Sequence, residues 1–207
     1  MINTIKLLEL LNNNQLEDLK KALEENTREE AAKKNGTKNK LTIIKKLQKE
    51  AEKMPSSCRG VQPCNVGRVE YNGFMNSCMV LADSTTDYGY AKSENGFNCG
   101  KMFADIPEIR YNIDLDDLKQ FIALDKANKK ADRRATPKPY IIELEDGRRA
   151  GFNPVYLLNC LNFCDSTEIK LFTTKQTNNN CVVYKNPMQV SSADNSRLAC
   201  LLPVNIA

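Results

Sequence analysis

Histidine and tryptophan are absent from this 207-residue sequence. The lack of histidine removes the side chain that most often serves as a general base, as a metal ligand or as the partner of a nucleophilic serine or cysteine. An enzyme would have to use lysine, aspartate, glutamate or cysteine, so non-catalytic functions are favoured. The sequence also lacks any run of about eighteen consecutive apolar residues, the length that predicts a membrane-spanning helix. We expect neither a cofactor nor a membrane partner.

The N-terminal stretch MINTIKLLELLNNNQ is amphipathic and carries Glu9 early. A secretory signal would instead have a basic region that leads into an apolar core and a small-residue cleavage site. The pattern therefore predicts a cytoplasmic protein. In that compartment cysteines are normally kept reduced.

The sequence contains eight cysteines, and none of them forms a Cys-x-x-Cys pair. Cys160, Cys181 and Cys200 lie within apolar runs, where a free thiol packs as a small hydrophobic group. A zinc site that combines Cys58, Cys64 and two distant cysteines is the alternative, but these spacings do not fit structural zinc sites. We therefore predict reduced, buried thiols and no metal site.

Residues 4–54 are predicted to form two helices, because leucine and isoleucine recur at steps of three and four residues. Asn35-Gly36 breaks the pattern, and the second helix is expected from about Lys40 to Lys53. Charges of both signs on the polar faces are typical of a solvated surface, although the lysines could also contact phosphates. The net charge of +4 permits nucleic-acid contact without requiring it.

A connector rich in proline, serine, cysteine and glycine separates an expected N-terminal helical segment, 1–55, from an α+β domain, 64–207. After it, the stretches SCMVLAD and DYGYAKS are predicted strands. Asp83 and Asp87 lie in the DSTTD turn between them. A small enzyme that uses these carboxylates or Cys99 is one alternative function. It would require a concave pocket in which these groups converge.

A capped helix is predicted next. Asp114 is suited to the N-cap, and Asp117 lies where an acid stabilises a helix N-terminus. The other end of this helix carries a basic cluster, which either offsets the helix dipole or contacts nucleic-acid phosphates. The cluster consists of Lys126, Lys129, Lys130, Arg133 and Arg134.

The C-terminal part predicts strands around one short helix. PYIIELEDG has the alternation of a half-buried strand, and Asn153-Pro154 supplies the cap and first residue of a helix. EIKLFTT, CVVYKN and LACLLPVNI are further predicted strands. The sequence therefore predicts an α+β fold with helices packed on an antiparallel sheet.

The order of these segments resembles the last domain of the bacterial DNA polymerase III β sliding clamp. The matching stretches are GFNPVYLLNCLNF, EIKLF, CVVY and LACLLPVNI. In that family a Phe-Asn dipeptide, here Phe152-Asn153, enters a short helix that bears adjacent leucines, and the chain closes on a strand where Leu202-Pro203-Val204 stand here. IDLDDLKQFIAL also resembles a helix start that is common in clamp domains. The good match covers residues 150–206, and a looser one begins near residue 67.

The resemblance implies a single clamp-like domain and a non-catalytic, processivity-type function in DNA replication. Its partners would be double-stranded DNA and replication proteins that carry clamp-binding peptides. The DNA-facing residues would be Lys119, Lys126, Lys129, Lys130, Arg133 and Arg134. The apolar peptide pocket would include Tyr156, Leu157, Leu202, Pro203 and Val204.

The sequence also departs from the family. A bacterial clamp chain has three such domains, whereas this chain is long enough for one and a helical segment, so it could encircle DNA only as a homo-oligomer. The helix over 153–163 contains no lysine or arginine, and Asn205 replaces a basic residue. A small clamp-like protein of this kind would suit a phage or mobile element. A structural adaptor that uses its N-terminal helices to bind another protein is a further alternative.

Overall fold

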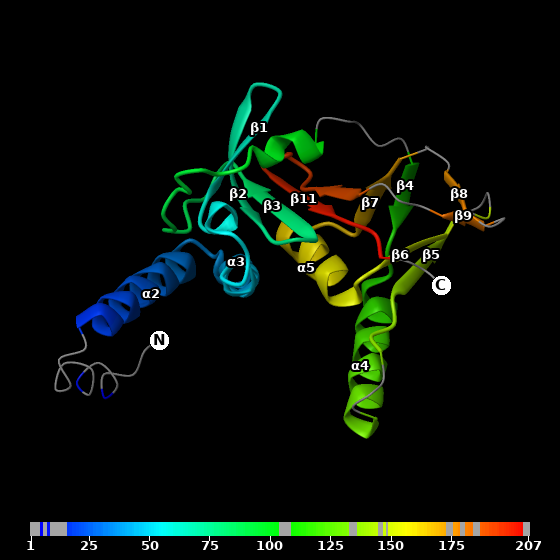
Figure 1. The fold of residues 1–207 in the computed structure, drawn as a ribbon, viewed down its shortest axis with the longest axis horizontal. Helices are drawn as coiled ribbons and strands as arrows, with labels where there is room; N and C mark the ends of the chain where they lie inside the picture. The colour runs from blue at the N-terminus through cyan, green and yellow to red at the C-terminus, as the bar shows by residue number, and fades with distance from the viewer. Residues whose placement is uncertain are drawn as a thin grey trace.

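An antiparallel sheet of seven strands forms the centre of the described chain, and a four-stranded sheet lies beside it (Figure 1). The computed structural model describes residues 5, 8, 16–103, 109–132, 136–144, 147, 149–172, 176–178, 181–183 and 187–204. The large sheet has the order β1-β2-β3-β11-β10-β7-β4. Its strands are β1 (Gln62–Val66), β2 (Val69–Met75), β3 (Met79–Asp83), β4 (Ile109–Asn112), β7 (Glu168–Leu171), β10 (Met188–Ser191) and β11 (Arg197–Leu201).

The smaller sheet has the order β5-β6-β9-β8, and its β6–β9 pair is parallel. Its strands are β5 (Tyr140–Glu143), β6 (Arg149–Phe152), β8 (Gln176–Asn178) and β9 (Cys181–Val183). The helices are α2 (Leu16–Lys34), α3 (Lys38–Ala51), α4 (Leu115–Ala131) and α5 (Pro154–Cys164), with short 3-10 turns η1 (Ser56–Cys58) and η2 (Cys99–Phe103). Among the residues that the structure describes, no helix is both long and apolar enough to span a membrane.

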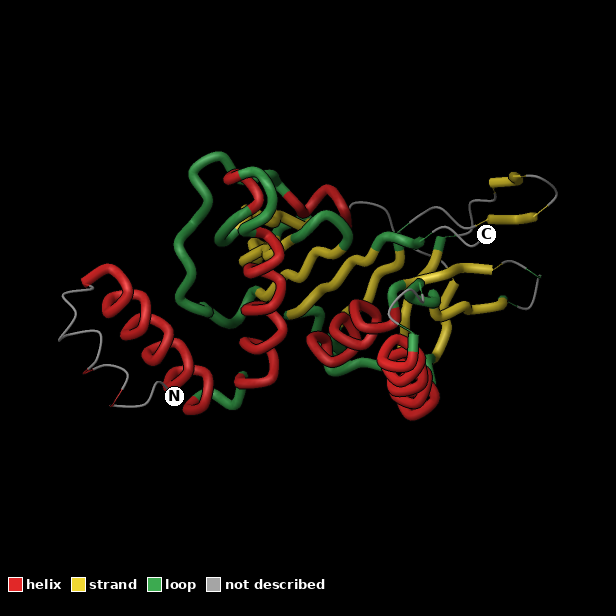
Figure 2. Tube along the Cα trace, turned by 60° about the horizontal axis from the view of Figure 1, so that its bottom comes forward, coloured by secondary structure: helices red, strands yellow, loops and turns green. Residues whose placement is uncertain are grey.

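The large sheet is built from two similar halves that meet where β3 pairs with β11. In one half α3 precedes β1, β2 and β3, and in the other α5 precedes β7, β10 and β11. Because β3 and β11 run antiparallel, this repetition places α3 and α5 on the same side of the sheet. The two helices contact each other there, and α5 also contacts α4 (Figure 2). The result is a row of three helices, α3-α5-α4, on one face.

The hydrophobic core lies between this helix row and the large sheet. Leu41, Ile44 and Leu47 of α3 belong to the same buried cluster as Leu157 and Leu161 of α5. Their spacing of three and four residues turns one face of each helix toward the sheet. Since α3 is part of this core, the connector over residues 54–63 does not separate it from the sheet domain. Helix α2 extends away from the sheet (Figure 1).

Two predicted helix starts are confirmed by their capping hydrogen bonds. The Asp114 carboxylate accepts from the backbone N–H groups of Asp116 and Asp117, at 2.8 Å and 3.1 Å. The Asn153 side chain accepts from the N–H groups of Val155 and Tyr156 in the same way. Each cap satisfies donors that the first helical turn leaves without a partner.

The predicted strand in DYGYAKS is wrong, although the SCMVLAD strand is confirmed as β3. The backbone turns at Gly89, which has a φ of 71°. Arg28 of α2 donates to the Gly89 carbonyl at 2.8 Å and stacks over the Tyr90 ring. Contacts with a distant helix thus replace the strand ladder that the local pattern suggests.

Asp165 joins both halves of the fold at the C-terminal end of α5. Its backbone is left-handed, with a φ of 51°. Its carboxylate accepts from Lys40 Nζ at 2.8 Å and from Arg197 Nη2 at 2.9 Å. One exposed carboxylate therefore ties α3, α5 and β11 together.

Replacement of Asp165 by Asn should lower the free energy of unfolding by about 1 kcal/mol, a modest value because the carboxylate is solvent-exposed. Asparagine tolerates the left-handed backbone, so the substitution tests the charge alone. Urea unfolding monitored by circular dichroism measures the difference. Glu94→Gln, at an exposed site outside this network, is the control. Equal stability of the two variants would show that the ion pairs contribute nothing.

Candidate nucleic-acid and peptide-binding surfaces

The α3-α5-α4 row has an uncharged centre and basic flanks. Helix α5 has the sequence PVYLLNCLNFC, with no ionisable side chain other than tyrosine and cysteine. Helix α3, KNKLTIIKKLQKEA, carries five lysines and one glutamate. Any electrostatic attraction for phosphates on this face must therefore come from α3 and α4.

The lysines of α3 divide into paired and exposed groups. Lys40 bonds to Asp165, and Lys45 Nζ lies 2.6 Å from carboxylate oxygens of both Glu25 and Glu29. The hydrogen bond from Lys45 lowers the pKa of Glu29 to about 2. Burial lowers the pKa of Lys45, but its two carboxylate partners outweigh burial and raise it. The two ion pairs of Lys45 anchor α2 on α3. The exposed group is Lys38, Lys46 and Lys49.

The lysines predicted on α4 show the same division. Lys119 lies 3.1 Å from Asp116, and Lys129 lies 2.9 Å from Asp125. Lys126 and Lys130 are exposed, and the C-terminal half of α4 extends past the sheet (Figure 1). Arg133 and Arg134, also predicted to face DNA, lie outside the described residues. The exposed lysines of α3 form a second basic group. The sequence pattern favoured a solvated surface for these lysines over a phosphate contact.

An apolar strip lies on the smaller sheet where the chain end joins it. Ile141 pairs with Gly151, and Gly151 forms an antiparallel bridge with Val204. Directly opposed residues in antiparallel strands share one face, so these three residues form a row across the sheet. Ile141 and Val204 are exposed by 38% and 36%, and Gly151 between them has no side chain. We call these three residues the apolar strip.

The predicted peptide-pocket residues do not all reach the surface. Leu202 and Val204 are exposed and Pro203 is partly exposed. Leu157 is fully buried in the core, because α5 turns this position toward the sheet. A docked peptide cannot contact Leu157 in this structure. Ile141 and Gly151 were not predicted for this surface, because nothing in the local sequence reveals which strand pairs with Val204.

Tyr156 is a contact between helices. Its hydroxyl donates to Glu50 Oε2 at 2.9 Å, and Asn76 Nδ2 donates to the same oxygen at 2.6 Å. Burial and the bond to Glu50 raise the pKa of Tyr156 to about 12. The side chain thus joins α5 to α3 and to the turn after β2.

The groups proposed for an enzyme do not form a common site. Asp83 is fully buried and accepts from the Tyr88 hydroxyl and from the N–H groups of Thr85 and Thr86. Asp87 accepts from the Gly89 N–H. Both carboxylates therefore stabilise turns. Among the residues that the structure describes, no group of three or more cysteine, aspartate or glutamate side chains could hold a metal ion.

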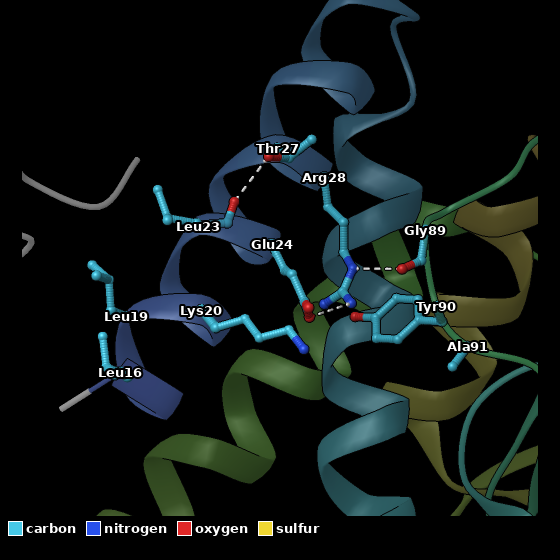
Figure 3. A pocket seen from close by; sticks show the side chains of 10 residues that line it. All are labelled: Leu16, Leu19, Lys20, Leu23, Glu24, Thr27, Arg28, Gly89, Tyr90 and Ala91. Atoms are coloured by element: carbon cyan, nitrogen blue, oxygen red, sulfur yellow. Dashed lines mark hydrogen bonds and ion pairs between the residues drawn. The ribbon is translucent and has the colours of Figure 1, made fainter.

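An open groove of about 860 Å³ lies between α2 and residues 89–91 (Figure 3). Leu16, Leu19 and Leu23 line the α2 side, and Tyr90 lines the other. Arg28 extends from α2 to Tyr90 and Gly89 (Figure 3). The groove surface is mostly apolar, and its charged lining residues are Lys20, Glu24 and Arg28, of which Arg28 pairs with Glu24.

Replacement of Tyr156 by Phe should reduce stability by about 1 kcal/mol, because Glu50 loses one donor but keeps Asn76. The raised pKa implies that this contribution is present below pH 10 and disappears as pH rises toward 12. The wild type and variant should therefore differ in urea midpoint at pH 8 and converge as the pH rises through about 12, measured by circular dichroism. A constant difference across this range would contradict the assignment.

No protein-family model and no curated protein matches the sequence. Solved structures do match. The Helicobacter pylori beta clamp aligns with a TM-score of 0.50 at 8% identity, over 81% of this chain and 63% of that chain. A DNA polymerase III beta subunit from Eubacterium rectale gives 0.46 at 10% identity, over 81% and 64%. The Thermotoga maritima beta subunit gives 0.36 at 13% identity, over 67% and 42%.

This chain spans less than two thirds of the length of each of these three proteins. At such low identity the likeness concerns the fold and not the activity. The expectation of an α+β fold with helices on an antiparallel sheet is confirmed by the topology. The chain therefore has a clamp-like α+β fold that matches part of the bacterial DNA polymerase III beta subunits.

Proposed function

We propose that this chain is a non-catalytic, clamp-like protein that binds duplex DNA through the helix row. The observation that carries the proposal is the pair of exposed lysine groups, on α3 and α4, that flank the uncharged α5. Contacts between lysines and phosphates need no particular base sequence, so such a face suits binding along any duplex. The fold supplies the shape, and the flanking helices supply the positive potential.

The apolar strip is proposed as the docking site for a peptide of a replication partner. Exposed apolar side chains on both sides of a glycine leave room for an apolar side chain of the peptide. The exposed Leu202 and partly exposed Pro203 extend this surface along the chain. Because the chain is shorter than the clamps it matches, encirclement of DNA would require several copies.

Neutralisation of the α3 lysines in a Lys46→Gln/Lys49→Gln variant should weaken duplex binding at low salt. The slope of log affinity against log salt should become shallower by about 1.8, since each lost phosphate contact contributes about 0.9. Fluorescence anisotropy with a labelled duplex measures both quantities. Lys126→Gln/Lys130→Gln tests the α4 group in the same assay.

The matched control is Lys92→Gln/Lys101→Gln, which removes two exposed lysines from the segment beside β1. This variant should bind like the wild type. Identical losses in all three variants would mean that net charge, and not the helix row, determines binding. A wild-type protein without affinity for duplex DNA at low salt would disprove the DNA-binding proposal.

Val204→Asp and Ile141→Asp should each abolish peptide binding, because both place a charge in the apolar strip. The probe is the DNA ligase peptide that the Helicobacter pylori clamp binds, with isothermal titration calorimetry as the measurement. Leu124→Asp, on a 66% exposed residue of α4, is the control and should bind normally. Undiminished binding by the two strip variants would place the peptide elsewhere, and absence of wild-type binding would remove this part of the proposal.

A further inference from the structure

The edge of the large sheet at β1 is covered by residues 91–99, which we call the strap. Val61 forms two backbone hydrogen bonds with the strap, to Ala91 and Ser93, each at 2.9 Å. Beyond Val61 the contacts use side chains. Gln62 Oε1 accepts from the Phe97 N–H at 3.0 Å, and Asn98 Oδ1 accepts from the Asn65 N–H at 3.3 Å. The strap therefore blocks this edge from pairing with another strand.

Two glycines allow this close cover. A Cβ at Gly100 would overlap the Asn65 backbone, so η2 can approach β1 only because that side chain is missing. A Cβ at Gly73 would overlap Cys99 Sγ and would lie 3.2 Å from Cys64 Cβ. The space beside Gly73 thus holds the thiol of Cys99 next to Cys64. The sheet leaves a niche for two sulfur atoms at the end of the strap.

The two thiols in this niche belong to different elements. Cys64 is on β1 and Cys99 begins η2, and both are completely buried in one small hydrophobic cluster. Cys99 Sγ donates to the Pro63 carbonyl at 3.5 Å. A hydrogen bond with Cys99, together with burial, raises the pKa of Cys64. Seven cysteines, Cys64 and Cys99 among them, are free thiols in this structure.

We propose that Cys64 and Cys99 form a reversible disulfide, driven by hydrogen peroxide, that locks the strap over the edge of β1. One thiol, as its thiolate, attacks a peroxide oxygen; the O–O bond breaks, and the sulfenic acid and one water form. The second thiolate then attacks the sulfenic sulfur; the S–S bond forms, the S–O bond breaks, and a second water leaves. Two thiols lose two electrons to one peroxide, and their protons end in the waters.

Because both thiols are buried, the disulfide can form only after the strap moves. Peroxide reaches the sulfur atoms only when the strap lifts, which opens two backbone hydrogen bonds and four that involve a side chain. The disulfide then closes a loop between β1 and η2 and restricts the lifted state. This function is independent of the DNA and peptide surfaces, which lie on the helix row and the smaller sheet.

The test is oxidation of the folded full-length chain with hydrogen peroxide, followed by alkylation of the remaining thiols in denaturant and peptide mass spectrometry. We expect one cross-linked peptide pair containing Cys64 and Cys99, with a mass lower by two hydrogens, which dithiothreitol reverses. Cys64→Ala and Cys99→Ala should lose it, and Cys78→Ala should keep it. Hydrogen exchange at the amides of Ser93 and Phe97 should slow in the oxidised protein.

Several outcomes would overturn the proposal. Alkylation of both Cys64 and Cys99 after oxidation shows that no disulfide forms. Cross-links to other cysteines or between two chains would show that oxidation joins a different pair of thiols. A Cys64–Cys99 disulfide without slower exchange in the strap shows that the bond forms but does not lock. The wild-type experiment decides each case by itself, even where an alanine variant fails to fold.

Discussion

Burial of the uncharged helix α5 is the constraint on which the other features of this structure depend. Leu157, Leu161 and Phe163 have almost no exposed surface. Burial of each such side chain contributes on the order of 1.5–3 kcal/mol, so α5 is stable only when it is covered on most of its circumference. The cover comes from β3, β10 and β11 beneath it and from α3 and α4 on its flanks. The meeting of the two sheet halves at β3 and β11 thus lies directly under the most apolar helix.

This arrangement moves the charge of the helix row to its flanks. A central helix that packs against two neighbours has little surface left for lysine or arginine, whereas α3 and α4 each keep one face in water. Some of the lysines exposed there, such as Lys119, pair with an acidic residue of the same helix, whereas others face water. Lys40 and Lys45 hold α3 to α5 and α2 through carboxylates, and this leaves Lys38, Lys46 and Lys49 as the solvated cations of the helix.

The carboxylates considered as catalytic candidates, Asp83 and Asp87, stabilise turns in the structure. Asp83 is buried, and four donors around its carboxylate hold the turn after β3. A buried carboxylate without such donors would be strongly destabilising. The two sheets also differ in how their surfaces are covered. At β1 the strap satisfies the edge through backbone and side chains, whereas the apolar strip on the smaller sheet leaves apolar groups in water.

Local sequence patterns predict most of the helices and strands of this protein. The caps at Asp114 and Asn153, the apolar faces of α3 and α5 and the strand alternation could all be predicted, because each depends on residues within one or two turns. The α+β fold and the clamp-like order follow from them. The pairing of the lysines, the burial of Leu157 and the alignment of Ile141, Gly151 and Val204 in one strip could not be predicted in this way. These outcomes depend on strand register and helix packing between residues far apart in the chain. The spacing of residues within one segment does not reveal such partners.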